Sequence, residues 1–146
     1  MKVALRTDAS MRIGTGHLMR CLTLADALRS AGARTRFVCR ALPRGLREVV
    51  TAGGHELAEL PAALATTAGN GDGRVAPVGS QRAQLAHAAW LGATQQEDAA
   101  ATRDALGENV VWDWLVVDHY AIDARWETRL RAAARRILAI DDLADR

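Results

Sequence analysis

Short apolar runs alternate with amphipathic segments along most of the chain. Apolar runs of roughly four to eight residues bounded by turn residues are typical of buried strands, and a spacing of three and four is typical of helices. The runs predict strands at 2–6, 35–40, 55–60, 114–118 and 136–140. The helical spacing predicts helices at 18–31, 43–52, 95–106 and 123–135. Strands that alternate with helices indicate β-α-β units and a parallel sheet.

The ends of the first two predicted helices carry clear signals. In the first helix, the apolar residues from Leu18 to Leu28 recur at i, i+3, i+4, i+7 and i+10, which places them on one face. Gly32 follows this helix where a glycine commonly ends one. Pro43 begins the second helix, and the two glycines at 53 and 54 end it.

The domain organisation follows from the length of 146 residues and from one irregular segment. This length suits one ordinary domain or one half of a two-domain protein, and we expect a single domain over 1–146. Residues 61–84 match neither the strand pattern nor the helical spacing and are rich in Gly, Thr and Ala. We therefore expect a flexible loop or an insertion there. The predicted fold class is α/β, a Rossmann-like parallel sheet flanked by helices.

Composition and charge exclude several classes of protein. The 19 basic and 17 acidic residues nearly cancel and form no basic stripe, so we expect no nucleic-acid partner. An apolar stretch of about 18 residues and a secretory leader are both absent, so we expect no membrane partner. Cys21 and Cys39 match no metal-ligand spacing, which favours buried free thiols and a cytoplasmic protein.

Parallel sheets bind ligands outside the carboxyl ends of their strands, so the first loop is a candidate site. There, Gly14, Thr15, Gly16 and His17 lie between the first strand and the first helix. Glycines let the backbone approach a ligand, and a helix N-terminus favours phosphate or a developing anion. A histidine at this edge can act as a general base or acid. The alternative is a tight turn with a hydrogen-bonded histidine.

Several known nucleotide-binding and catalytic motifs do not match this sequence. A dinucleotide fingerprint needs a third glycine where Met19 stands, and a P-loop needs a Gly-Lys-Ser/Thr sequence that the chain lacks. A nucleotidyltransferase motif would need His or Thr in place of Gly14. A Gly-x-Ser-x-Gly elbow is also absent from the sequence. We therefore expect no nicotinamide, flavin or other cofactor.

The carboxyl end of the fourth predicted strand holds a second candidate, Asp118, His119 and Tyr120. Asp118 could orient a histidine or bind a sugar hydroxyl, and Tyr120 could stack on a ligand or hydrogen-bond to it. The alternative is that Asp118 caps the next turn and Tyr120 packs against it.

Other polar residues do not suggest a site. The adjacent pair Asp141 and Asp142, followed by Asp145, favours a loop or an interdomain contact, because neighbouring side chains point apart. We therefore expect no metal site. His55 and His87 have no acidic or cysteine companion at ligand spacing, so we expect no function for either.

Four segments of the chain resemble one family. The first combines 2–10 with 13–28, and the others are 90–99, 114–120 and 140–146. They resemble, in order, the UDP-2,4-diacetamido-2,4,6-trideoxy-β-L-altropyranose hydrolases of pseudaminic acid biosynthesis. The resemblance implies a two-domain GT-B-like fold of which this chain would be the N-terminal half. The nucleotide-binding C-terminal domain would then be its partner, and the 146-residue chain alone would be inactive.

The resemblance also implies a chemistry. Water would attack the anomeric carbon of a UDP-sugar, UDP would leave, and the anomeric configuration would invert without a metal. His17 falls on the family's general base, residues 14–16 fall on its substrate-binding turn, and residues 118–120 fall on its cleft motif. The alternatives are a sugar-nucleotide glycosyltransferase and a non-catalytic domain that binds a sugar or a protein.

Overall fold

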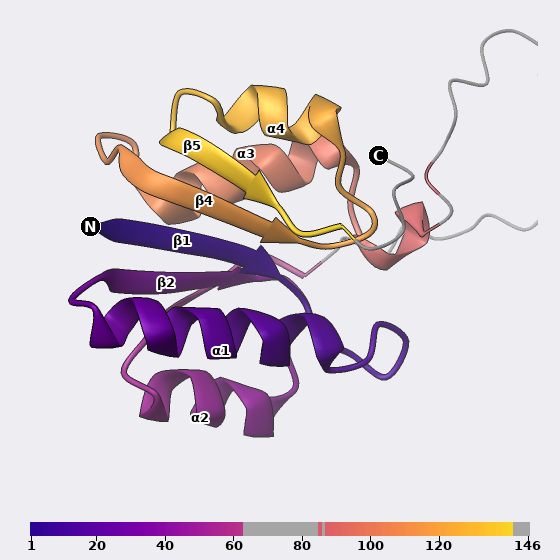
Figure 1. The fold of residues 1–146 in the computed structure, drawn as a ribbon. Coiled ribbons are helices and arrows are strands. Elements are labelled where there is room, and N and C mark those ends of the chain that lie inside the picture. The colour runs from indigo at the N-terminus through magenta and orange to yellow at the C-terminus, as the bar shows by residue number, and fades with distance from the viewer. Residues whose placement is uncertain (63–84, 86, 142–146) are drawn as a thin grey trace, which may run out of the picture.

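A five-stranded parallel sheet forms the centre of the molecule (Figure 1). The computed structural model describes residues 1–62, 85 and 87–141. The strands follow the order β3-β2-β1-β4-β5, and all neighbouring pairs are parallel. They are β1 Lys2–Thr7, β2 Arg34–Cys39, β3 Glu56–Glu59, β4 Trp112–Asp118 and β5 Ala134–Ala139. The helices are α1 Gly16–Ser30, α2 Arg44–Ala52, α3 Gln95–Leu106 and α4 Ala124–Leu130, with a short 3₁₀ helix, η1, at Ala88–Trp90. The expected α/β, Rossmann-like class is confirmed.

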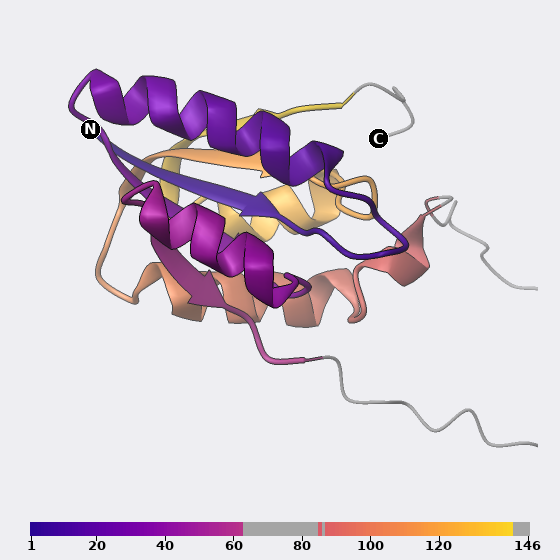
Figure 2. The ribbon, with the colours of Figure 1, turned by 90° about the horizontal axis from the view of Figure 1, so that it is seen from below.

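Two layers of helices cover the sheet. Helices α1 and α2 lie on one face, and α3 and α4 lie on the other (Figures 1 and 2). Successive strand residues face opposite layers, so Val3 and Leu5 of β1 join the core under α1 and α2. Ala4 joins the core under α3 and α4. Arg6, next on that face, is fully buried, so an arginine occupies a core position beneath α3.

The first half of the chain follows the sequence pattern closely. Helix α1 buries Leu18, Cys21, Leu22 and Ala25, as its apolar spacing predicts. Gly32 follows it with φ of 83°, a left-handed conformation that explains the glycine. Of the expected loop at 61–84, all but the first two residues lie outside the described residues. No helix in the described part of the chain is long and apolar enough to cross a membrane.

In the second half of the chain, three boundaries of helices and strands differ from the predicted ones. Strand β4 begins at Trp112, two residues before the predicted start. Helix α4 ends at Leu130 rather than at residue 135, and β5 begins at Ala134 rather than at residue 136. The extra helical turn does not form because Ala134 pairs with Trp112 across the two strands and is buried in the core.

Candidate functional site

The carboxyl ends of β1 and β4 bring the two predicted site segments together. Thr7, the last residue of β1, is in register with Asp118, the last residue of β4. Helix α1 begins just beyond this edge and carries His17 in its first turn. His17 Nδ1 lies 2.6 Å from Asp118 Oδ1, although the residues are 101 positions apart in sequence.

The pair of His17 and Asp118 has a defined electrostatic arrangement. Burial opposes the charge on Asp118, but hydrogen bonds and charges from His17 and Arg20 outweigh it and hold the pKa of this carboxyl below its usual value. Arg20 donates from Nε to Oδ2 and from Nη2 to Oδ1, both at 2.8 Å. A carboxylate accepts hydrogen bonds only, so we assign the proton of a neutral His17 ring to Nδ1. Nε2 is then the unprotonated nitrogen, as a general base requires.

The turn before α1 is open to a ligand. Gly14, Thr15 and Gly16 are exposed. Gly14 donates its backbone N–H to Ser10 O at 2.8 Å and has φ of 79°, a conformation that strains other residues. Thr15 makes no side-chain cap on α1. The first N–H groups of α1 therefore suit an anion or a phosphate.

Aromatic rings flank the histidine on one side. The ring of Tyr120 meets that of His17 edge-on, with centroids 4.4 Å apart. His87 lies 5.5 Å from Tyr120 and 4.2 Å from Trp90, again between centroids. The sequence interpretation expected no function for His87, and only the tertiary structure places it beside Tyr120.

His119 points into the protein instead of toward the edge. The residue is 2% exposed, and its Nδ1 accepts the backbone N–H of Ala121 at 3.0 Å. Its Nε2 lies 3.2 Å from Asp8 Oδ2, outside hydrogen-bond geometry. Because Nδ1 accepts the N–H of Ala121, we assign the ring proton to Nε2. Burial, the largest effect, lowers the pKa of His119. Of the three residues 118–120, the structure thus brings Asp118 and Tyr120 to His17 and keeps His119 behind them.

A buried ion network that sequence analysis did not identify lies under this edge. Arg6 donates to Asp98 through Nε at 3.1 Å and Nη2 at 2.8 Å, and its Nη1 lies 2.9 Å from Asp8 Oδ1. Arg40 donates from Nε at 3.1 Å and from Nη2 at 3.0 Å to Asp98 Oδ2, the oxygen that also accepts from Arg6 Nη2. Burial opposes the charges, but each group's partners outweigh it: the pKa values of Asp8 and Asp98 are lowered and that of Arg6 is raised. The network ties β1 to α3 and to the chain after β2.

The remaining candidate residues lie away from the pair of His17 and Asp118 or have structural partners. His55 is buried between Thr35 Oγ1 at 2.6 Å and Asp26 Oδ1 at 3.1 Å, contacts that join β3 to β2 and α1. The free, buried state predicted for the two cysteines is confirmed. Asp141 follows β5, whereas the other aspartates of its cluster lie outside the described residues. Among the described residues, no three His, Cys, Asp or Glu side chains gather as a metal site would require.

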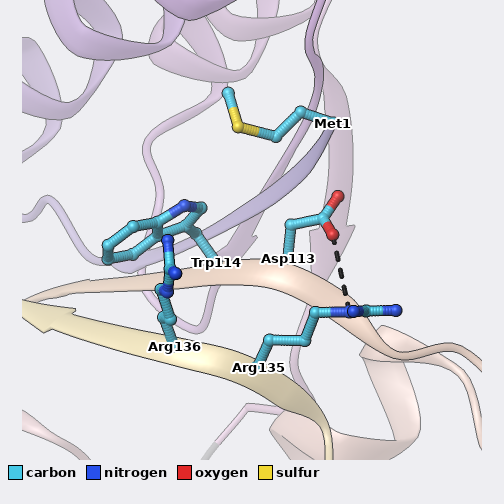
Figure 3. A pocket seen from close by; sticks show the side chains of 5 residues that line it. All are labelled: Met1, Asp113, Trp114, Arg135 and Arg136. Atoms are coloured by element: carbon cyan, nitrogen blue, oxygen red, sulfur yellow. Dashed lines mark ion pairs between the residues drawn. The ribbon is translucent and has the colours of Figure 1, made fainter.

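Two of the hollows on the described part of the surface lie at opposite edges of the sheet. One is lined by Met1, Asp113, Trp114, Arg135 and Arg136 (Figure 3). These residues stand at the amino ends of β1, β4 and β5, so this hollow is at the edge opposite His17. The other is at the carboxyl edge, where its lining includes Arg40, Ala88, Gln95, Ala121 and Arg125.

Two comparisons with known proteins give no relative. The sequence matches no protein-family model, and a search of curated proteins finds no match.

Proposed function

We propose that the chain carries the catalytic base of a hydrolase that cleaves a UDP-linked 2,4-diacetamido-2,4,6-trideoxy sugar at its anomeric carbon and releases UDP. The substrate and the reaction are those implied by the resemblance of residues 13–28 and 114–120 to the hydrolase family. The structural observation that supports the proposal is the 2.6 Å contact between His17 Nδ1 and Asp118 Oδ1, which fits a general base. A histidine whose Nδ1 proton is held by a carboxylate presents Nε2 as the base. UDP leaves readily, so the reaction chiefly needs an activated nucleophile.

The reaction is a single displacement. Water donates a proton to His17 Nε2 as its oxygen forms a bond to the anomeric carbon. The bond between that carbon and the diphosphate oxygen breaks on the opposite side, UDP departs with the electron pair, and the anomeric configuration inverts. Asp118 stabilises the imidazolium that forms, and the proton then passes to solvent. No step of this scheme uses a metal.

The proposal assigns the leaving group to the start of α1. The exposed turn at 14–16 and the uncapped N–H groups of the helix support this assignment. Preorganised N–H donors stabilise negative charge that develops on a leaving oxygen. In the same proposal, a C-terminal nucleotide-binding domain of a GT-B-like fold completes the site, and the protein acts in the cytoplasm in pseudaminic acid biosynthesis.

The test is UDP release from the altrose-configured UDP-sugar by the full-length gene product, without metal or acceptor. We expect release by the wild type and a loss of about 10²–10⁴-fold in His17→Asn, because a positioned base typically supplies that factor. Circular dichroism checks that the variant is folded. Release only after an acceptor is added would favour a glycosyltransferase, and binding without turnover would favour a non-catalytic domain; either result would overturn the hydrolase.

A further inference from the structure

A cluster of three aromatic rings lies beside His17. Tyr120 meets the His17 ring edge-on at 4.4 Å, and beyond it His87 and Trp90 lie 5.5 and 6.1 Å from the Tyr120 centroid. These three rings, Tyr120, His87 and Trp90, are named here the aromatic wall. They come from two segments far apart in sequence, the loop after β4 and the short helix η1 with the residue before it. Figure 1 shows the segment of η1 beyond the carboxyl ends of the strands.

Each ring of the wall is only partly buried. Trp90 packs against the core under α3 and α4, which holds it in place without covering it completely. Aromatic side chains with one side supported and another accessible are common in small-molecule sites, where they supply apolar contact area. The hollow at the carboxyl edge is lined by Ala88 and Ala89 of η1 and by Ala121, whereas none of the three rings lines it.

We infer that the aromatic wall binds the methyl-bearing side of the sugar, and that Trp90 and His87 are specificity residues for a 6-deoxy, N-acetylated sugar. This inference rests on the proposed function. The sugar in question carries a C6 methyl group and two acetamido methyl groups, which are the apolar groups that such a wall takes up. His87 and Trp90 add this contact beyond Tyr120, the ring nearest the base.

The position of the wall favours the sugar over the uracil base. A water activated by His17 must lie about 3 Å from the anomeric carbon. Tyr120 touches the His17 ring, so the wall begins beside the reacting carbon. The diphosphate separates that carbon from the nucleoside. The wall therefore faces the sugar, whereas uridine lies at the far end of the substrate.

The experiment compares two ligands on the full-length gene product. A His17→Asn background slows turnover by the expected factor of about 10²–10⁴, enough for binding to be measured, and calorimetry gives the affinities for the UDP-sugar and for UDP. We expect Trp90→Ala to weaken binding of the UDP-sugar about tenfold or more, since losing apolar contact in a pocket costs at least that factor. Affinity for UDP should stay within about twofold, because in this account UDP does not touch the wall.

Two further variants serve as a control and as a second test of the wall. Trp114→Ala is the matched control, because Trp114 is also partly buried but lies at the opposite edge of the sheet (Figure 3); it should change neither affinity. His87→Ala removes a partly buried ring that lies just before η1, outside the strands and α-helices, so it tests the wall even if Trp90→Ala fails to fold.

The outcomes separate this inference from the proposed hydrolysis. An equal loss for UDP and UDP-sugar would assign the wall to uridine, and no loss in Trp90→Ala and His87→Ala would remove the wall from the site; each overturns the inference. If the variants lose affinity for the UDP-sugar but not for UDP, and the wild type releases no UDP, the inference on the aromatic wall is supported and the proposed hydrolysis is refuted. If the wild type releases UDP and neither variant shows a selective loss, hydrolysis stands and the wall fails.

Discussion

Replacing Asp98 by Asn should destabilise the fold strongly, although the side chains have nearly the same shape. The Asp98 carboxylate accepts two hydrogen bonds from Arg6, two from Arg40 and one from Trp126 Nε1 at 2.9 Å. It is fully buried, as is Arg6. An amide has one acceptor oxygen, and its NH₂ group would face guanidinium donors.

The loss of stability in Asp98→Asn follows from the charges that remain. Without the Asp98 charge, Arg6 keeps only Asp8 as a carboxylate partner in the described network. Removing one partner of a buried ion pair costs about 3–5 kcal/mol, because the other charge stays desolvated. This is a large share of the roughly 5–15 kcal/mol that stabilises a typical domain. We expect the midpoint of thermal unfolding to fall by about 10 °C or more.

Urea unfolding followed by tryptophan fluorescence measures the effect. Asp104→Asn is the matched control, since Asp104 is on the same helix but exposed, and its stability should stay within about 0.5 kcal/mol of the wild type. A loss below about 1 kcal/mol in Asp98→Asn would refute the reasoning, because it would mean that the buried guanidinium groups do not depend on this charge.

Three more predictions follow from the site and its surroundings. Asp118→Asn should lower kcat for UDP release by about 10²-fold or more while the fold is kept, since an amide can stabilise the wrong tautomer of His17; an unchanged kcat would contradict the assigned role. The pKa values of Asp98 and Asp118 are lowered in the fold, so their stabilisation is present above the unfolded value near pH 4 and is lost as the pH falls further. The urea concentration at the unfolding midpoint should therefore decrease as the pH falls below about 4, and it should decrease less steeply in Asp98→Asn than in the wild type. Parallel curves of midpoint against pH for the two proteins would contradict this prediction. Burial raises the pKa of Cys39 to about 12 and raises that of Cys21, so iodoacetamide at neutral pH should alkylate both thiols more than roughly hundredfold slower than in the unfolded chain; equal rates would show that they are accessible.

Local patterns predicted those features that depend on neighbours along the chain. The apolar run of β1, the one-sided spacing of α1 and the glycine at residue 32 each specify their own conformation. The rule that parallel strands align their carboxyl ends placed His17 and Asp118 at one edge. It could not predict a 2.6 Å contact, which depends on the register of β1 with β4.

Features that depend on tertiary packing could not be predicted from local sequence patterns. The alanines at 132–134 favour helix by intrinsic propensity, but burial of Ala133 and Ala134 beside β4 ends the helix early. Arg6 looks like the polar end of a strand, and only the position of α3 over β1 supplies its partner Asp98. The contact of His87 with Tyr120 likewise joins segments with no shared local pattern.

The most direct test of the central claim is the protonation state of the two His17 nitrogens, read from ¹⁵N chemical shifts of the neutral imidazole. Our account predicts a proton on Nδ1, held by Asp118, and an unprotonated Nε2 that can accept a proton from water. In Asp118→Asn, this preference should weaken. A proton on Nε2 in the wild type would contradict the account, because His17 could not then act as the base at that nitrogen.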